Sequence, residues 1–156
     1  MATVGRVGRR MGPGRVGVRV DRGVSALGNP YVVREEEERR AACDAYRTLL
    51  RVTVDSSDPR EEWYGAKWVR QIGEQRGFTG EVGRWHWAGA RAELAWMHRM
   101  MRRCRLELRC QCAPRMCHAE SVAAELARME RASPGTGSSW MRRRTGRKGK
   151  VAVTAV

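Results

Sequence analysis

Apolar residues recur along the chain with two different periods, and the change of period marks the elements that the sequence predicts. A period of two ending near Asp21 predicts a first strand, whose apolar positions are Val16, Val18 and Val20. From about Glu35 the period becomes helical, and one face of this helix carries Ala42, Tyr46, Leu49 and Leu50. A strand followed by a loop and a helix is therefore the first predicted unit.

Two more helices are predicted in the middle of the chain. Asp58 and Pro59 are typical of the N-cap and first position of a helix, which we expect to run to about Glu74. After a stretch interrupted by glycines, the helical period returns at Ala90, Leu94, Met97 and Met101. This central region also holds most of the tryptophans, which either stack nucleic-acid bases or belong to the core: Trp63, Trp68, Trp85, Trp87 and Trp96.

The clearest strand signal lies late in the chain, where one face carries Leu106, Leu108, Cys110 and Cys112. Residues 113–116 interrupt it, and a last helix is predicted from Cys117 or His118 to Arg131. The alternation of strands and helices predicts an α/β fold, with a small, mostly parallel sheet and flanking helices.

The length of 156 residues fits one domain. Residues 1–14 contain four glycines and one proline among their arginines, so we expect a flexible basic arm there. A Ser/Gly/Pro-rich segment follows the last helix, so residues 15–133 are the predicted domain and residues 134–156 a flexible, disordered basic tail. On this prediction a chain without both ends still folds.

The net charge of +14 lies mostly at the two ends. Residues 1–19 contain five arginines and residues 139–156 six bases, with no acid in either, which leaves +3 for residues 20–138. Such ends favour binding to nucleic acid or another polyanion. The same bias also has a neutral explanation, because only three of the 31 basic residues are lysines and GC-rich coding produces arginine.

No apolar run approaches the ~20 residues of a membrane helix, and the N-terminus lacks the apolar stretch of a secretory signal. We therefore expect a soluble, cytoplasmic protein with no membrane partner. An organelle transit peptide at the arginine-rich N-terminus is the alternative. The five cysteines do not suggest a disulfide framework, because three of them fall within eight residues.

The strongest chemical signal is the group Cys110, Cys112, Cys117 and His118, four potential metal ligands within nine residues. Three interpretations remain open: a zinc site, a reactive thiol–imidazole site, or small buried residues of a strand. The spacing differs from the usual zinc knuckle, and adjacent residues such as Cys117 and His118 often cannot both reach one ion.

The chain resembles an uncharacterised family of phage and bacterial proteins, the domain of unknown function family 4326. The motifs that carry the resemblance are Val20-Asp21-Arg22, Gly28-Asn29-Pro30-Tyr31, Tyr46, and Cys110-x-Cys112-x-Pro114-x-x-Cys117-His118. The resemblance covers about residues 16–50 and 104–130. Leu27 stands where the family has an aromatic residue, and residues 52–103 are longer than the family needs. The family brings no established reaction.

Both motifs follow a predicted strand and precede a predicted helix, so in a parallel sheet they should meet at its carboxyl edge. We therefore expect one pocket. The first hypothesis is a protein that binds or processes a nucleotide or another phosphate-bearing ligand there. Its catalytic residues are Cys117 with a lowered pKa, His118 and Asp21, and its ligand contacts are Arg22, Gly28, Asn29 and Cys112. The second is a non-catalytic zinc module, held by the four cluster residues, whose basic tails bind nucleic acid. The sequence leaves open whether the protein is an enzyme.

Overall fold

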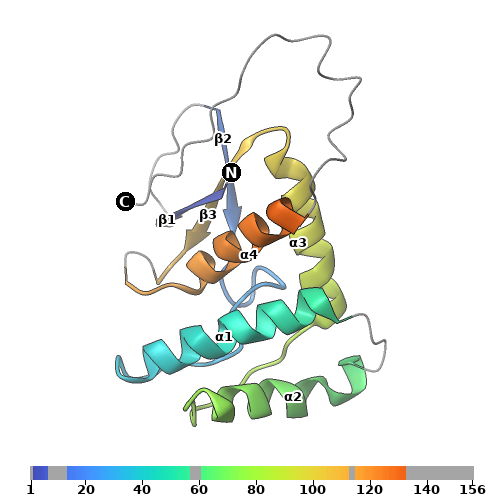
Figure 1. Ribbon diagram of the computed structural model, residues 1–156. Coiled ribbons are helices and arrows are strands. Elements are labelled where there is room, and N and C mark those ends of the chain that lie inside the picture. The colour runs from blue at the N-terminus through green and yellow to red at the C-terminus, as the bar shows by residue number, and fades with distance from the viewer. Residues whose placement is uncertain (1, 7–13, 57–60, 113–114, 133–156) are drawn as a thin grey trace.

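A computed structural model describes residues 2–6, 14–56, 61–112 and 115–132 of the chain. Three strands and four helices are found in this part of the chain (Figure 1), which confirms the predicted α/β class. The strands are β1 (Ala2–Arg6), β2 (Arg15–Arg19) and β3 (Arg105–Cys110). The helices are α1 (Glu38–Asp55), α2 (Glu61–Gln75), α3 (Trp87–Met101) and α4 (His118–Ala132).

The sheet is entirely parallel, with β3 between β1 and β2. Leu106 and Leu108 of β3 are fully buried, as the alternation predicts. Glu107, on the other side of the strand, is also buried, and it forms ion pairs with Arg15 and Arg109. The central strand is therefore covered on both faces, as is usual for parallel sheets.

The strand β1 was not predicted, and it corrects our expectation that residues 1–14 form a flexible arm. Ala2–Arg6 pairs with β3 along its whole length, with Ala2 opposite Leu106 and Arg6 opposite Cys110. The arginines and glycines around this segment obscure its short β-forming core of Thr3 and Val4. Residues 7–13 of the predicted arm and all of the predicted tail, 134–156, lie outside the described residues.

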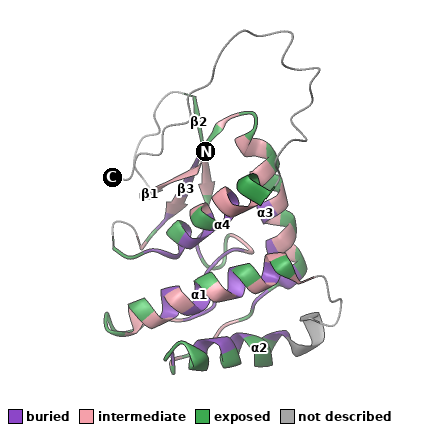
Figure 2. Ribbon diagram, in the orientation of Figure 1, coloured by how far each residue is buried: buried purple, intermediate pink, exposed green. Residues whose placement is uncertain are grey.

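The helices α4, α1 and α2 are stacked in this order away from the sheet, and α3 runs along one side of the stack (Figure 1). α3 and α4 contact the sheet, α1 packs on α4, and α2 packs on α1. The buried stripe of α1 contains the residues that the helical period predicts, Ala42, Tyr46, Leu49 and Leu50 (Figure 2). α1 begins at Glu38, three residues later than predicted, and the predicted cap at Asp58 lies outside the described residues.

Two of the tryptophans, Trp85 and Trp87, are core residues, whereas Trp68 and Trp96 are 36% and 40% exposed. The search for membrane-spanning helices, made over the described residues, found none of sufficient length and apolarity.

The parallel arrangement brings the ends of β2 and β3 to the same edge of the sheet. The Val20 N–H donates to the Arg109 carbonyl at 3.0 Å, so the pairing continues one residue past β2. The loop after β2 and the loop after β3 consequently begin side by side, about ninety residues apart in sequence.

Candidate metal centre

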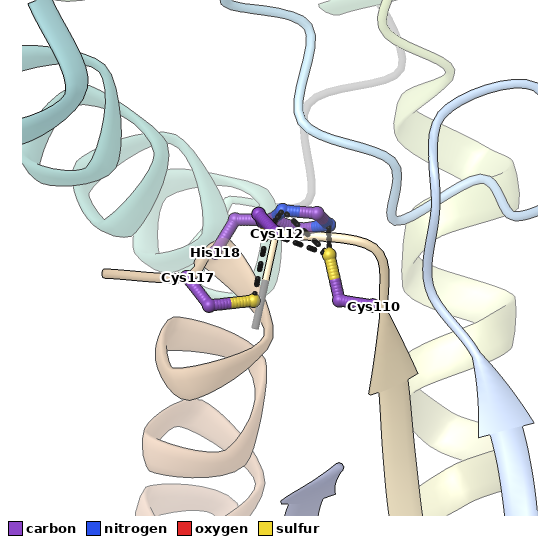
Figure 3. A group of neighbouring side chains, drawn as sticks. All are labelled: Cys110, Cys112, Cys117 and His118. Atoms are coloured by element: carbon purple, nitrogen blue, oxygen red, sulfur yellow. Dashed lines mark hydrogen bonds between the residues drawn. The ribbon is translucent and has the colours of Figure 1, made fainter. Parts of the chain in front are cut away.

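Four side chains from the loop after β3 and its flanking elements converge at this edge (Figure 3). Cys110 is the last residue of β3, Cys112 lies in the following turn, and Cys117 and His118 stand where α4 begins. Their potential ligand atoms all lie within 4.8 Å of one another. Cys117 and His118 therefore do reach a common point, although they are adjacent in sequence.

The three sulfur atoms are crowded. Cys112 Sγ lies 2.7 Å from Cys110 Sγ and 2.9 Å from Cys117 Sγ. Both distances exceed the ~2.05 Å of a disulfide bond, and all three residues are free cysteines. Thiols are weak hydrogen-bond donors and acceptors, so they satisfy one another poorly. Three thiols gathered in this way are a donor set suited to a soft or borderline metal ion.

His118 completes the set through one ring nitrogen. Its Nε2 lies 2.7 Å from the Val20 carbonyl oxygen, which can only accept, so Nε2 carries a proton and donates. Its Nδ1 lies 3.5 Å from the sulfurs of both Cys110 and Cys112. A second ring nitrogen bonded to a carbonyl is the usual support of a histidine metal ligand, because it fixes the tautomer and the ring orientation.

Backbone groups around the cluster provide further support. The Gln111 N–H, between the first two cysteines, donates to Asp21 Oδ1 at 2.8 Å. The Ala119 N–H donates to Cys117 Sγ at 3.4 Å in the first turn of α4. A divalent ion held by three thiolates would leave one net negative charge, which the N-terminal dipole of α4 would stabilise.

Burial and hydrogen bonding shift the acidities within the cluster. Hydrogen bonding with Cys110 and Cys117 lowers the pKa of Cys112, the half-buried member. Burial alone would lower the pKa of His118, but hydrogen bonding with Cys110 and Cys112 raises it to about 10. Without metal, the cluster therefore favours a thiolate beside an imidazolium. A metal ion would replace the proton on Nδ1.

Cys117 differs from the reactive thiol that the sequence suggested. It is only 2% exposed, and hydrogen bonding with Cys110 and Cys112, together with burial, raises its pKa. We expected a lowered pKa, because Cys117 precedes a helix. The helix does supply the Ala119 N–H, but contact with the other two thiols outweighs it.

The other predicted site residues belong to the loop after β2, and one of them, Asp21, contacts the segment that holds the cluster cysteines. Asp21 is bonded to Gln111, and it also forms an ion pair with Arg19 at 2.7 Å. Arg22 Nε and Nη2 donate to the Asn29 and Tyr31 carbonyls, both at 2.9 Å. We predicted this guanidinium as a phosphate contact, but here it stabilises its own loop through these two hydrogen bonds.

Gly28 and Asn29 likewise shape this loop. A Cβ at Gly28 would lie 2.5 Å from Arg22 Cα, so only glycine permits so close an approach of two backbone segments. Asn29 Oδ1 accepts a hydrogen bond from the Tyr31 N–H at 3.0 Å. An Asn two residues before the N–H that it binds is a known turn signal, so sequence alone could have suggested this role.

Two groups that the sequence analysis did not assign to the site connect the loop after β2 to the cluster. The Tyr46 hydroxyl donates to the Leu27 carbonyl, and the Tyr46 ring meets the His118 ring edge-on with centroids 5.3 Å apart. The second group is the Val20 carbonyl itself. A backbone carbonyl leaves no signal in a sequence, whereas Tyr46 belongs to the motifs quoted above.

Fold and site together define a small α/β domain with a parallel sheet and a cluster of three cysteines and one histidine at its carboxyl edge. The family model described as "Domain of unknown function (DUF4326)" matches residues 6–128. The chain belongs to this family. No curated protein and no solved structure matched the chain.

Proposed function

We propose that the chain is a zinc-binding α/β module in which Cys110, Cys112, Cys117 and His118 hold one zinc ion. The observation that carries this proposal is the convergence of four ligand atoms within 4.8 Å. Three cysteines and one histidine form one of the common structural zinc sites, and the set contains no carboxylate of the kind that hard cations prefer.

The site has the character of a structural centre. Catalytic zinc sites keep a coordination position for water or substrate, whereas structural sites fill all four positions with protein ligands. Here the protein offers four, and Cys110, Cys117 and His118 are at most 7% exposed. The ion would join the end of β3 to the start of α4, and through His118 and Val20 also to the end of β2.

A thiol–imidazole site for a nucleotide or another phosphate-bearing ligand is the competing proposal. Cys112 supports it, because it is only partly buried and its pKa is lowered. The contacts of Arg22 and Asn29 weaken it, because both residues bind their own loop. We therefore favour the metal site over a reaction at these thiols.

Elemental analysis of the purified full-length chain tests the proposal. We expect one zinc per chain, lost on Cys117→Ser. Cys43→Ser is the matched control, because Cys43 is a buried free cysteine of α1 outside the cluster, and this variant should keep its zinc. A metal-free protein whose Cys112 reacts rapidly with iodoacetamide, and which carries a nucleotide by mass spectrometry, would support the competing proposal instead.

A further inference from the structure

The end of α3 and the start of β3 carry exposed arginines that the metal site does not use. Arg99, Arg103 and Arg105 are exposed, and within the described residues no carboxylate pairs with them. The neighbouring acids are engaged elsewhere: Glu130 with His98 and Arg102, and Glu107 with Arg15 and Arg109. The positive charge of these three arginines is therefore not neutralised by the fold.

Trp96 extends this group along α3. It lies three residues before Arg99, a spacing that places the two on one face of α3. Arg103 follows in the turn after α3, and Arg105 begins β3. The Trp96 side chain is 40% exposed, whereas Trp85 and Trp87 are core residues. The exposed part of the Trp96 ring is thus open to contact with a ligand.

The described chain also ends beside α3, because the last turn of α4 lies against that helix (Figure 1). Glu130 in that turn lies 2.7 Å from His98 and 3.9 Å from Arg102. The chain then continues into residues 139–156, which contain six basic residues and no acid. A polyanion bound at the end of α3 would therefore lie close to the last described residues of the chain.

We propose that Trp96, Arg99, Arg103 and Arg105, which we call the α3 basic face, bind single-stranded nucleic acid. Arginines contact phosphates, and an exposed aromatic ring stacks on an unpaired base, the combination found in single-strand binding surfaces. Duplex DNA offers phosphates but no free base face, so Trp96 favours a single strand. This inference is independent of the zinc proposal, since none of its residues belongs to the cluster.

Fluorescence anisotropy of the full-length chain with a labelled oligothymidylate tests it. The variant Arg99→Gln/Arg103→Gln should weaken binding and reduce the slope of log affinity against log salt by about 1.4, the value for two lost single-strand phosphate contacts. The matched control is Arg70→Gln/Arg76→Gln, which removes two exposed charges from α2 and its C-terminal end. The control should leave the slope unchanged.

Stacking is tested separately. Trp96→Leu should weaken oligothymidylate binding about tenfold, within the range for one stacked base, and should leave duplex binding unchanged. Trp68→Leu, which removes another partly exposed tryptophan, should have no effect. Equal losses in the two double-arginine variants would overturn the proposal, because only total charge would then matter. So would an unaltered Trp96→Leu, or preferential binding to phosphatidylserine vesicles through the same arginines.

Discussion

The two loops at the carboxyl edge of the sheet are held in different ways. The loop after β2, residues 20–31, is fastened by many hydrogen bonds between side chains and backbone. Arg22 and Asn29 bind within it, Tyr46 reaches it from α1, and Glu93 of α3 accepts from Ser25 Oγ and the Ala26 N–H at 2.7 and 2.9 Å. These bonds satisfy the polar groups of a segment whose residues 27–31 are all buried.

The loop after β3 has little of this support. Among its described residues, 111–112 and 115–117, the internal backbone bond is the one from the Arg115 N–H to the Cys112 carbonyl at 3.0 Å. The cluster of three thiols and one imidazole is the main set of contacts between the two ends of this loop. The comparison teaches that the first loop is stabilised by its own hydrogen bonds, whereas the second would be cross-linked by the zinc ion that we propose.

The largest effect should follow from removing the metal. Chelation should lower the free energy of unfolding by about 4 kcal/mol where free zinc had stood a thousandfold above its Kd. The loss should concentrate in the second loop, because that loop has fewer hydrogen bonds of its own than the first. Denaturant unfolding with and without chelator measures the total, and hydrogen exchange locates it.

In the hydrogen-exchange experiment, amides of residues 110–120 should lose protection while those of residues 21–31 keep theirs. Uniform loss of protection would contradict the contrast between the two loops. So would an unfolding curve that the chelator does not move, since the second loop would then be stable without an ion.

An intermediate effect is expected when the first loop loses its own fastening. Arg22→Met removes two charge-assisted hydrogen bonds to carbonyls and should cost about 3 kcal/mol of stability. Zinc content should stay at one per chain, because Arg22 does not contact the cluster. The measurement is thermal unfolding together with elemental analysis.

Arg84→Met serves as the control for Arg22→Met, since Arg84 is exposed and should tolerate the change. If Arg22→Met folded as stably as the unmodified chain but lost affinity for a phosphate ligand, the structural role assigned to Arg22 would be wrong.

The smallest effect concerns Asp21, which belongs to the first loop and binds the second. Asp21→Ala removes the acceptor of the Gln111 N–H and should weaken zinc binding about tenfold, as is typical of groups that support metal ligands. Asp21→Asn should restore much of this affinity, because an amide oxygen can accept the same bond. Competition with a chromophoric zinc chelator compares the variants. Equal affinity in Asp21→Ala and the unmodified chain would show that the two loops are not coupled at this point.

Local patterns were enough to predict most of the fold. The period of two identified β2 and β3, and the helical period identified α1, α3 and α4, because each pattern reflects a face that must be buried. The helix α2 was predicted from the capping signal at Asp58 and Pro59. β1 escaped, since a five-residue edge strand gains its stability from pairing with β3, more than a hundred residues away.

The site was predictable as a position but not as a set of contacts. The spacing of Cys110, Cys112, Cys117 and His118 indicated a chemical centre, and parallel topology indicated that Asp21 would lie nearby. The roles of Arg22 and Asn29 could not be predicted in the same way, because the sequence does not distinguish an arginine that binds carbonyls from one that binds a phosphate. Only the backbone path of residues 27–31 separates the two.

X-ray absorption at the zinc edge of the purified full-length protein tests the central claim most directly. We predict three sulfur neighbours at about 2.3 Å and one nitrogen neighbour at about 2.0–2.1 Å, the bond lengths of a site with three cysteines and one histidine. A shell dominated by oxygen and nitrogen, or a protein that takes up no zinc when it is supplied, would contradict the account.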